Sequence, residues 1–377
     1  MFKYITAGES HGKGLVGVIE GFPANVNIDV EKIDKDLGRR QGGYGRGARM
    51  KIERDQIEIL SGMRAGKTLG SPISFLITNR DYANWKNHMD PVGPNEDSRR
   101  VKAPRPGHAD LVGALKYQFT DIRNVLERSS ARETAVRVAI GSFAKQLLET
   151  FDIEVKSHVT AIGGACLDKE IRDFSSLDLA EKSEVRCCDK KTELAMIEEI
   201  KNAKNEGDSL GGIFQIYIKG VPAGLGSYVH WDRKLDGKLA QALMSIQGIK
   251  GVEIGHAFEN AQKRGSEIHD EIFYRKDLGY YRKTNHSGGI EGGMSNGEDI
   301  IIRCAMKAIP TLYKPLRTID IENKNEVLAT VERSDTCAVP AASIVGEMVA
   351  ITVIAQEFLR KFTGDSMEEI RKQWKNY

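Results

Sequence analysis

Two histidines stand in glycine- and proline-rich segments of this 377-residue chain, where an imidazole could transfer protons. His11 follows Ser10 in ITAGESHGKG, residues 5–14, and His108 follows a Pro-Gly pair in RPGHADL, residues 105–111. Histidine titrates near neutral pH, which suits a general acid or base. Because neighbours in an extended segment point to opposite faces, a Ser10 nucleophile with His11 as its base is disfavoured. An ordinary loop remains the alternative to an acid–base histidine.

Two basic runs indicate a binding site for an anionic ligand. The first, RRQGGYGRGARMKIER, covers residues 39–54 and contains one acid, Glu53. The second, RRVKAPRPGH, covers residues 99–108. Arginine binds phosphate and carboxylate bidentately, and glycine lets backbone amides approach such groups. A small ligand with several negative charges is favoured over a solvated loop or an RNA-binding segment. The basic residues are Arg39, Arg40, Arg46, Arg49, Lys51, Arg54, Arg99, Arg100, Lys102 and Arg105.

Two further segments contain residue types that are typical of ligand sites. In LERSSARETA, Arg128 and two serines open a helix, where amides and the helix dipole favour an anion. Ser130 and Glu133 also fit a plain capping box, and both interpretations are compatible. SGGIEGGMSNG, residues 287–297, is either a flexible turn or a backbone that can pack flat against a planar ring.

Two more segments are ambiguous. ERSDTCAVP joins Arg333 and Asp335 ahead of an apolar helix, either as a surface ion pair or as part of a site. SGMRAGKTLG, residues 61–70, resembles the end of a phosphate-binding P-loop but has three residues between its glycines where that motif needs four. A turn between strands is therefore favoured there.

The composition excludes several classes of protein. The 55 basic residues nearly balance the 53 acidic ones, which argues against a general nucleic-acid or membrane binder. Five cysteines without a C-x-x-C pair predict reduced thiols in a cytoplasmic protein. The histidines show no metal-ligand spacing, so no metal is expected. The apolar run 338–355 contains Glu347 and predicts a buried helix and not a membrane span.

The elements that must position these residues mix helices and strands without strict alternation. This pattern favours an α+β fold, and no clean boundary divides the chain, so residues 1–377 are expected to form a single domain. The predicted strands lie within 1–18, 57–60, 73–78, 155–162, 212–218 and 300–306, and the predicted helices within 29–37, 111–126, 130–147, 193–203, 235–246, 338–355 and 366–377.

Six segments, in the same order, resemble blocks of the chorismate synthase family. GESHGKGLVGVIEGFP, ERSSARETAVRVAIG and RSDTCAVPAASIVGEMVA are similar to its three signatures. RPGHADL, KGVEIG and GGIEGGMSNG are similar to other blocks, and the likeness runs from Gly8 to about Ala350. The resemblance implies a β-α-β sandwich of the chorismate synthase type, commonly a homotetramer. It implies conversion of 5-enolpyruvylshikimate 3-phosphate into chorismate by anti 1,4-elimination of phosphate and a ring proton, with reduced FMN (FMNH2) and no net redox change.

The resemblance also implies roles for individual residues. His11 is expected to be a general acid for the departing phosphate, and His108 a proton donor or partner to the reduced flavin. Asp335 is expected to work with the flavin in taking the ring proton, and Ser10 to be a hydrogen-bonding neighbour. The residues that match the family's anionic pocket are Arg40, Arg46, Arg49, Arg105 and Arg132, and of these Arg40 and Arg46 also match positions assigned to NADP. The residues that match the family's flavin contacts are Arg128, Ser129, Ser130, Gln247, Gly248, Gly292, Lys307, Ala308, Ile309, Pro310, Thr311 and Arg333.

Some features depart from the family pattern or leave alternatives open. SIQGIKG and KAIPT differ from the commoner family sequences, which puts side-chain contacts to flavin in doubt more than the identity of the cofactor. A flavin-dependent oxidoreductase would consume NADPH during turnover. An RNA-binding protein would bind salt-sensitively without flavin, but only Tyr44 supplies an aromatic ring inside the first basic run. The lack of large insertions favours dependence on a separate flavin reductase, with NADPH as the reductant in members that reduce their own flavin.

Overall fold

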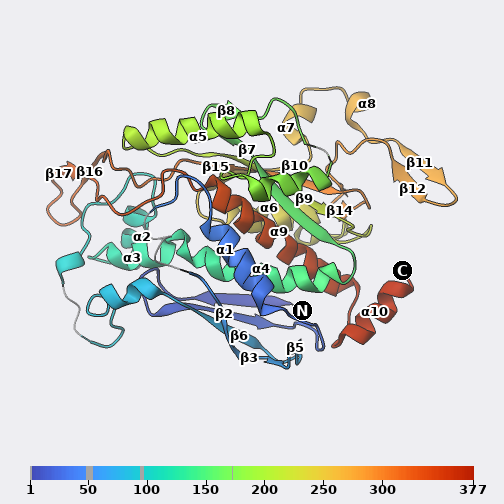
Figure 1. The fold of residues 1–377 in the computed structure, drawn as a ribbon, viewed down its shortest axis with the longest axis horizontal. Helices are drawn as coiled ribbons and strands as arrows, with labels where there is room; N and C mark the ends of the chain where they lie inside the picture. Colours follow the sequence, from blue (N-terminus) through green and yellow to red (C-terminus); the bar gives the residue numbers. More distant parts are fainter. Residues whose placement is uncertain (1, 48–53, 94–96, 172) are drawn as a thin grey trace.

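Two antiparallel sheets enclose a layer of helices in the computed structural model of this chain (Figure 1). The structure describes residues 2–47, 54–93, 97–171 and 173–377. This β-α-β arrangement confirms the predicted α+β sandwich. The predicted strand 300–306 has the expected bounds, and the apolar run 338–355 forms the core of the long central helix.

The N-terminal sheet has the strand order β1-β2-β6-β3. Each neighbouring pair is antiparallel, and Leu15, Ile19, Phe75 and Ile77 turn a buried face toward the helices. Its strands are β1 (Lys3–Ala7), β2 (Gly14–Glu20), β6 (Ile73–Thr78) and β3 (Glu58–Ser61). The ambiguous segment 61–70 forms the short hairpin of β4 (Met63–Arg64) and β5 (Lys67–Thr68), so the prediction of a turn is confirmed.

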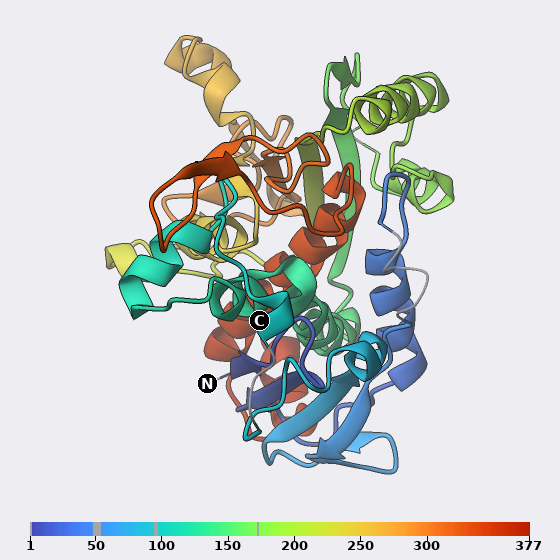
Figure 2. The ribbon, with the colours of Figure 1, turned by 90° about the vertical axis from the view of Figure 1, so that its left-hand side faces the viewer.

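The helix layer contains α1 (Val30–Gln41), α4 (Thr134–Glu149) and α9 (Val339–Lys361). Figure 2 shows α9 running between the sheets beside α4. Gly141 of α4 lets the two helices approach closely, because a Cβ there would lie 2.4 Å from Cβ of Met348. By length and composition α9 could span a membrane, but 94% of its apolar window is buried inside the protein, as in the core helix of a globular domain.

The second sheet has the order β10-β15-β9-β7-β8 and covers the other side of α9. Its strands are β10 (Ile249–Ile254), β15 (Ile300–Met306), β9 (Gly212–Lys219), β7 (Glu154–Ile162) and β8 (Ala165–Cys166). Helix α5 (Lys190–Asn205) packs on the β7–β8 edge, and α6 (Leu235–Met244) packs between α9 and β10.

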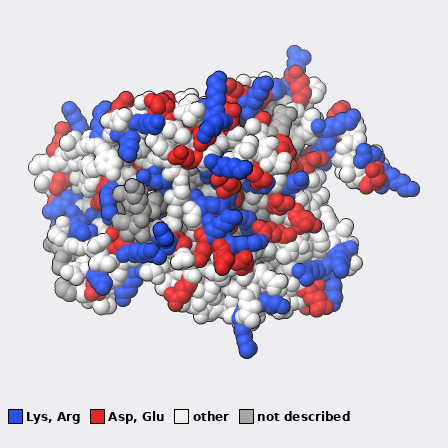
Figure 3. Space-filling view, in the orientation of Figure 1, with Lys and Arg blue, Asp and Glu red and all other residues white. Residues whose placement is uncertain are grey.

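Smaller elements surround this sandwich. Near the cavity described below lie α2 (Asp110–Tyr117) and α3 (Arg123–Ser129), while a projecting arm carries α7 (Ala257–Asn260), α8 (Gly265–Ile268) and the hairpin β11–β12 (Figure 1). The remaining elements are β11 (Ile272–Arg275), β12 (Gly279–Arg282), β13 (Ile290–Glu291), β14 (Met294–Ser295), β16 (Arg317–Ile319), β17 (Glu326–Leu328) and α10 (Met367–Lys375). Basic and acidic side chains are intermixed on the face drawn in Figure 3.

Several predictions of local structure were wrong. The first helix continues past Leu37 to Gln41, so Arg39 and Arg40 are helical. The predicted helix 111–126 is two helices, because Gln118 adopts a left-handed φ of 57° that ends α2. The capping box of Ser130 and Glu133 does not form in the expected way, since Ser130 accepts from the backbone N–H of Arg132 in a short 3-10 turn.

Candidate active site

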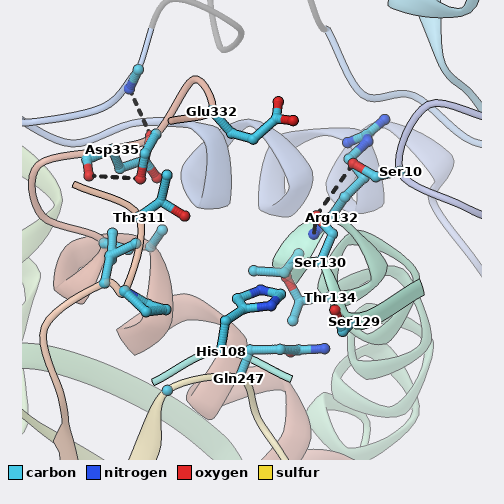
Figure 4. A pocket seen from close by; sticks show the side chains of 18 of the residues that line it. Ser10, His108, Ser129, Ser130, Arg132, Thr134, Gln247, Thr311, Glu332 and Asp335 are labelled. Atoms are coloured by element: carbon cyan, nitrogen blue, oxygen red, sulfur yellow. Dashed lines mark hydrogen bonds between the residues drawn. The ribbon is translucent and has the colours of Figure 1, made fainter. Parts of the chain in front are cut away.

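A cavity of about 420 Å³ opens where the end of α1, the junction of α3 and α4, and three loops meet. The loops cover residues 105–109, 306–311 and 332–335. In the view of Figure 4, Ser10, Ser130 and Arg132 lie on one side and Asp335 on the other, with His108 between them. Most of the predicted site residues line this cavity, namely Ser10, His11, Arg40, Arg46, Arg105, His108, Ser129, Ser130, Arg132, Gln247, Gly248, Lys307, Ala308, Ile309, Pro310, Thr311, Arg333 and Asp335.

Three predicted residues are not among those that line the cavity. The Arg128 guanidinium instead donates to the carbonyl oxygens of Thr6 and Gly8 at the end of β1. Gly292 lies in the β13–β14 turn with a positive φ of 58°. Arg49 lies outside the described residues.

His11 is held by a buried glutamate and an indole ring. Its backbone N–H donates to Oε2 of Glu127 at 2.7 Å, and its Nδ1 lies 2.9 Å from Oε1 of the same carboxyl group. Trp85 stacks on the imidazole with a centroid distance of 3.9 Å and an interplanar angle of 22°. Because Nδ1 faces Glu127, Nε2 lies on the opposite edge of the ring.

His108 is held by a second buried carboxylate. Its Nδ1 lies 2.6 Å from Oδ1 of Asp110, and Arg105 Nε donates to Oδ2 of Asp110 at 2.8 Å. Burial alone would raise the pKa of Asp110, but the hydrogen bonds from His108 and Arg105 outweigh it and hold this pKa well below its usual range. Arg105 also donates to Oγ1 of Thr311 at 2.8 Å, which ties this loop to residues 306–311.

Asp335 is fixed by the first basic run. Arg46 Nη1 donates to Oδ2 of Asp335 at 2.7 Å, and the backbone N–H of Gly47 donates to Oδ1 at 2.6 Å. Two segments almost 290 residues apart in sequence therefore place one carboxylate at the wall of the cavity.

Arg40 and Arg132 form a buried cationic pair around one carboxylate. Arg132 Nη1 donates to Asp55 at 2.6 Å, whereas Arg40 Nη1 lies 3.7 Å from the same carboxyl group. Burial, with smaller contributions from Arg132 and Arg46, outweighs the attraction of Asp55 and lowers the pKa of Arg40 to about 9. Within the described part of the chain, Arg40 Nη1 and Arg132 Nη2 are buried without a hydrogen-bond partner. Buried donors of this kind are costly unless a ligand satisfies them.

Uncharged groups complete the wall. Ser130 Oγ donates to Ser10 Oγ at 3.2 Å, so Ser10 and His11 engage different partners. Gln247 presents a buried Oε1 that has no hydrogen-bond partner among the described residues. Lys307 donates to the carbonyl oxygen of Gly107 and connects two of the loops.

Several residues of this site were not predicted from the sequence. Glu127 and Asp110 were not singled out, although they lie inside LERSSARETA and RPGHADL. Asp55 and Trp85 lie in segments without a recognisable motif. Conversely, the first basic run includes Arg39, which turns away from the cavity and forms ion pairs with Asp36, Glu181 and Glu347.

In the part of the chain that the structure describes, no group of three His, Cys, Asp or Glu side chains is arranged to hold a metal ion. The cavity brings together two carboxylate-held histidines, one fixed aspartate and a set of arginines.

Comparisons with known proteins agree with this arrangement. The family profile described as chorismate synthase matches residues 2–359. The chorismate synthases of Alkaliphilus metalliredigens and Alkaliphilus oremlandii are 72% and 54% identical to this chain, and each alignment covers all of the chain and 99% or 98% of the relative. A crystal structure of chorismate synthase superposes with a TM-score of 0.80 at 41% identity and covers 100% of this chain and 97% of that one. The chain belongs to the chorismate synthase family.

Proposed function

We propose that the cavity between α1, α3 and the three loops carries out the reaction of the family in this protein. That reaction converts 5-enolpyruvylshikimate 3-phosphate into chorismate and phosphate by anti 1,4-elimination, with reduced FMN and no net redox change. The observation that carries the proposal is the pair of buried, unsatisfied guanidinium donors beside two histidines. A substrate with a phosphate and two carboxylates supplies the negative charge that these donors need.

Anion binding is assigned to the arginines. Arg40 and Arg132 share only Asp55, so an oxyanion near both would satisfy donors that the protein leaves unpaired in its described part. Arg105 and Arg46 are each held by an aspartate, which fixes their guanidinium groups before a ligand arrives. Arg49 is proposed to contribute to the same pocket.

The cavity fits a flavin beside the substrate. Gln247 Oε1 is a buried acceptor without a partner among the described residues, and an isoalloxazine ring carries N–H groups that could satisfy it. Ser129, Ser130, Gly248, residues 307–311 and Arg333 would hold the ring, ribityl chain and phosphate. Arg128 and Gly292 are proposed to contact flavin only at its periphery, since they lie outside the cavity lining. When bound, reduced FMN supplies an electron-rich ring that supports the elimination.

Three residues are proposed to handle protons. His11 Nε2 donates a proton to the phosphate as the C–O bond breaks, and the bonding electrons leave with phosphate. Asp335 accepts the ring proton on the other side of the substrate, and the C–H electrons enter the new double bond. His108, anchored through Nδ1 on Asp110, holds a proton toward the cofactor. The electrons of the C–O bond leave with phosphate, and the electrons of the C–H bond form the new π bond. No external oxidant or reductant is therefore consumed.

We also propose the domain organisation, location, assembly and reductant of the protein. Residues 1–377 act as one domain, supported by a hydrophobic core that is continuous from β1 to α10. The protein is cytoplasmic, works as a homotetramer and relies on a separate flavin reductase. NADPH is the reductant where the chain reduces flavin itself, and Arg40 and Arg46 would then contact it. No nucleic acid or membrane is involved, which agrees with the intermixed charges on the one face drawn in Figure 3.

One anaerobic assay tests the proposed function. The purified protein is mixed with 5-enolpyruvylshikimate 3-phosphate and photoreduced FMN, and chorismate absorbance and phosphate release are followed together. We expect many turnovers per flavin and no product with oxidised FMN. Failure of a folded, flavin-binding protein to form product would support the oxidoreductase alternative, and a folded protein without flavin binding would refute the proposal.

A further inference from the structure

The His11 side chain is fixed on two sides by residues that carry no proposed role so far. Glu127 of α3 is 3% exposed and receives the backbone N–H of His11 at Oε2. The same carboxyl group lies 2.9 and 3.0 Å from Nδ1 of the imidazole. Trp85 stacks flat on one face of the ring. Both the position and the plane of the imidazole are therefore set by its neighbours.

Among the described residues, the charged groups around this contact include Glu127, Arg123, Arg99 and Glu332, whose carboxyl group accepts from Arg123 Nη2 at 2.8 Å. Arg123 Nη1 lies 3.6 Å from Oε1 of Glu127, and the guanidinium groups of Arg99 and Arg123 lie 3.9 and 5.2 Å from the centroid of Trp85. An ionised carboxyl group only accepts hydrogen bonds. The backbone N–H of His11 donates to Glu127, and Arg123 forms an ion pair with it at 3.6 Å, which is longer than a hydrogen bond. Nδ1 therefore has to donate to the ionised carboxyl group, and the proton that His11 can release sits on Nε2.

We infer that Glu127 is a positioning residue that keeps His11 protonated at Nδ1 and directs Nε2 toward the phosphate of the substrate. The inference rests on the proposed role of His11 as general acid. A general acid that has given up its Nε2 proton must remain a stable neutral imidazole, and the Glu127 carboxylate stabilises the Nδ1–H form. The residue acts through His11 and does not contact the reacting atoms.

The Glu127→Gln variant tests this inference because an amide offers only one acceptor oxygen. If this oxygen still accepts from the backbone N–H of His11, the amide NH2 group faces Nδ1 and can only donate to it, so Nδ1 has to be unprotonated. His11 then adopts the other tautomer, in which it is a poor proton donor. By comparison with other carboxylate–histidine pairs, kcat should fall by about 10²–10⁴-fold. KM and the Kd for FMN should change by less than about threefold, because no ligand contact is altered.

The test is a double-mutant cycle with His11→Asn under the anaerobic assay. If Glu127 acts only through His11, then Glu127→Gln should have almost no further effect on kcat in the His11→Asn background. Glu357→Gln is the matched control: it also neutralises a buried glutamate, 2.7 Å from Lys238, but its side chain lies away from the cavity. If Glu127→Gln does not fold, Glu127→Asp keeps the charge and withdraws the carboxyl group by one methylene, with an intermediate loss expected.

The outcomes separate the inference from the function on which it rests. A kcat loss in both single variants that does not multiply in the double variant supports the inference. Multiplying losses, or a Glu127→Gln enzyme within threefold of the unmodified kcat, would overturn it while leaving His11 as the acid. A His11→Asn enzyme with normal turnover would refute the proposed role of His11 and remove the basis of the inference.

Discussion

Arg40→Met should stabilise the ligand-free protein and weaken substrate binding at the same time. The fall of the Arg40 pKa to about 9 means that the folded state disfavours the charged guanidinium relative to the unfolded chain. At about 1.4 kcal/mol per pKa unit, this corresponds to roughly 5 kcal/mol at neutral pH, as an upper limit. The penalty is full below pH 9 and falls progressively as the pH rises from 9 toward the ordinary pKa of arginine, because over this range the folded state releases a proton that the unfolded chain still holds.

The surroundings of Arg40 tolerate its removal. Arg40 donates to Thr134 Oγ1 and to the carbonyl oxygen of Ala131, but Thr134 also donates to that oxygen at 2.6 Å, so it stays satisfied. Asp55 keeps its 2.6 Å contact with Arg132. Allowing for the lost attraction to Asp55, we expect a net gain of about 1–3 kcal/mol in the free energy of unfolding.

The neighbouring residue provides the matched control. Arg39 is only partly buried, and Glu347 and Glu181 outweigh the effect of its burial and raise its pKa above the usual range. Arg39→Met would leave Glu347 buried without this partner and should destabilise the protein by about 3–5 kcal/mol. Two identical substitutions at adjacent positions of α1 are therefore expected to change stability in opposite directions.

The assays are thermal unfolding without ligands and steady-state kinetics with reduced FMN. Loss of a charge-assisted hydrogen bond to an oxyanion costs about 1.5–3 kcal/mol, so kcat/KM for Arg40→Met should fall by about 10–100-fold. The reasoning is refuted if Arg40→Met unfolds at a lower temperature than the unmodified protein, or if its kcat/KM is unchanged.

Three other predictions test separate parts of the structure. Burial of His158 in β7 lowers its pKa from 6.5 to about 4, so the unfolded chain takes up a proton between these values that the folded state excludes. A change from pH 7 to pH 5 should therefore lower the free energy of unfolding by about 2 kcal/mol through His158. Urea unfolding should show that this free energy depends less steeply on pH in His158→Gln than in the unmodified protein. The control His269→Gln, at an exposed site, should show the same pH dependence as the unmodified protein. Gly141→Ala should lower the free energy of unfolding by about 2 kcal/mol or more despite better helix propensity, because its Cβ would lie 2.4 Å from Cβ of Met348. Gly38→Ala, where no atom lies within 4 Å of the added Cβ, should instead raise it by about 0.5–1 kcal/mol, and equal effects on the melting temperature would contradict the packing argument. Asp335→Asn should fold and bind FMN but lose at least about 10²-fold in kcat, and an Asn variant with normal turnover would remove Asp335 from the proposed proton transfer.

Periodic patterns predicted the long elements well. The continuous apolar run identified α9, and the strand Ile300–Met306 was predicted with its bounds, because burial on both faces leaves a dense apolar signal. The break between α2 and α3 had no such signal. A glutamine, Gln118, takes the left-handed conformation that glycine usually supplies at a helix end, so the pattern on both sides looked like one helix.

The candidate site was predictable where chemistry lies in local motifs. His11, His108 and Asp335 stand in short segments with recognisable neighbours, and all three line one cavity. Their supporting groups were harder to find. Glu127 is 116 residues from His11, and Asp55 is 77 residues from Arg132, so neither pairing leaves a pattern in the sequence. Such partners become visible only after the chain is folded.

Arg39 and Arg40 show why a basic run cannot be divided into structural and functional residues from sequence. Successive residues on an α-helix point about 100° apart, so the two guanidinium groups leave the last turn of α1 in different directions. One enters a cluster of carboxylates that compensates its charge, while the other enters a cavity where Asp55 is shared with Arg132. The residue whose charge the protein leaves under-compensated is the one that we propose to bind an anion. The balance of charge around each group, and not its place in a motif, is therefore our basis for separating the proposed binding arginine from the structural one.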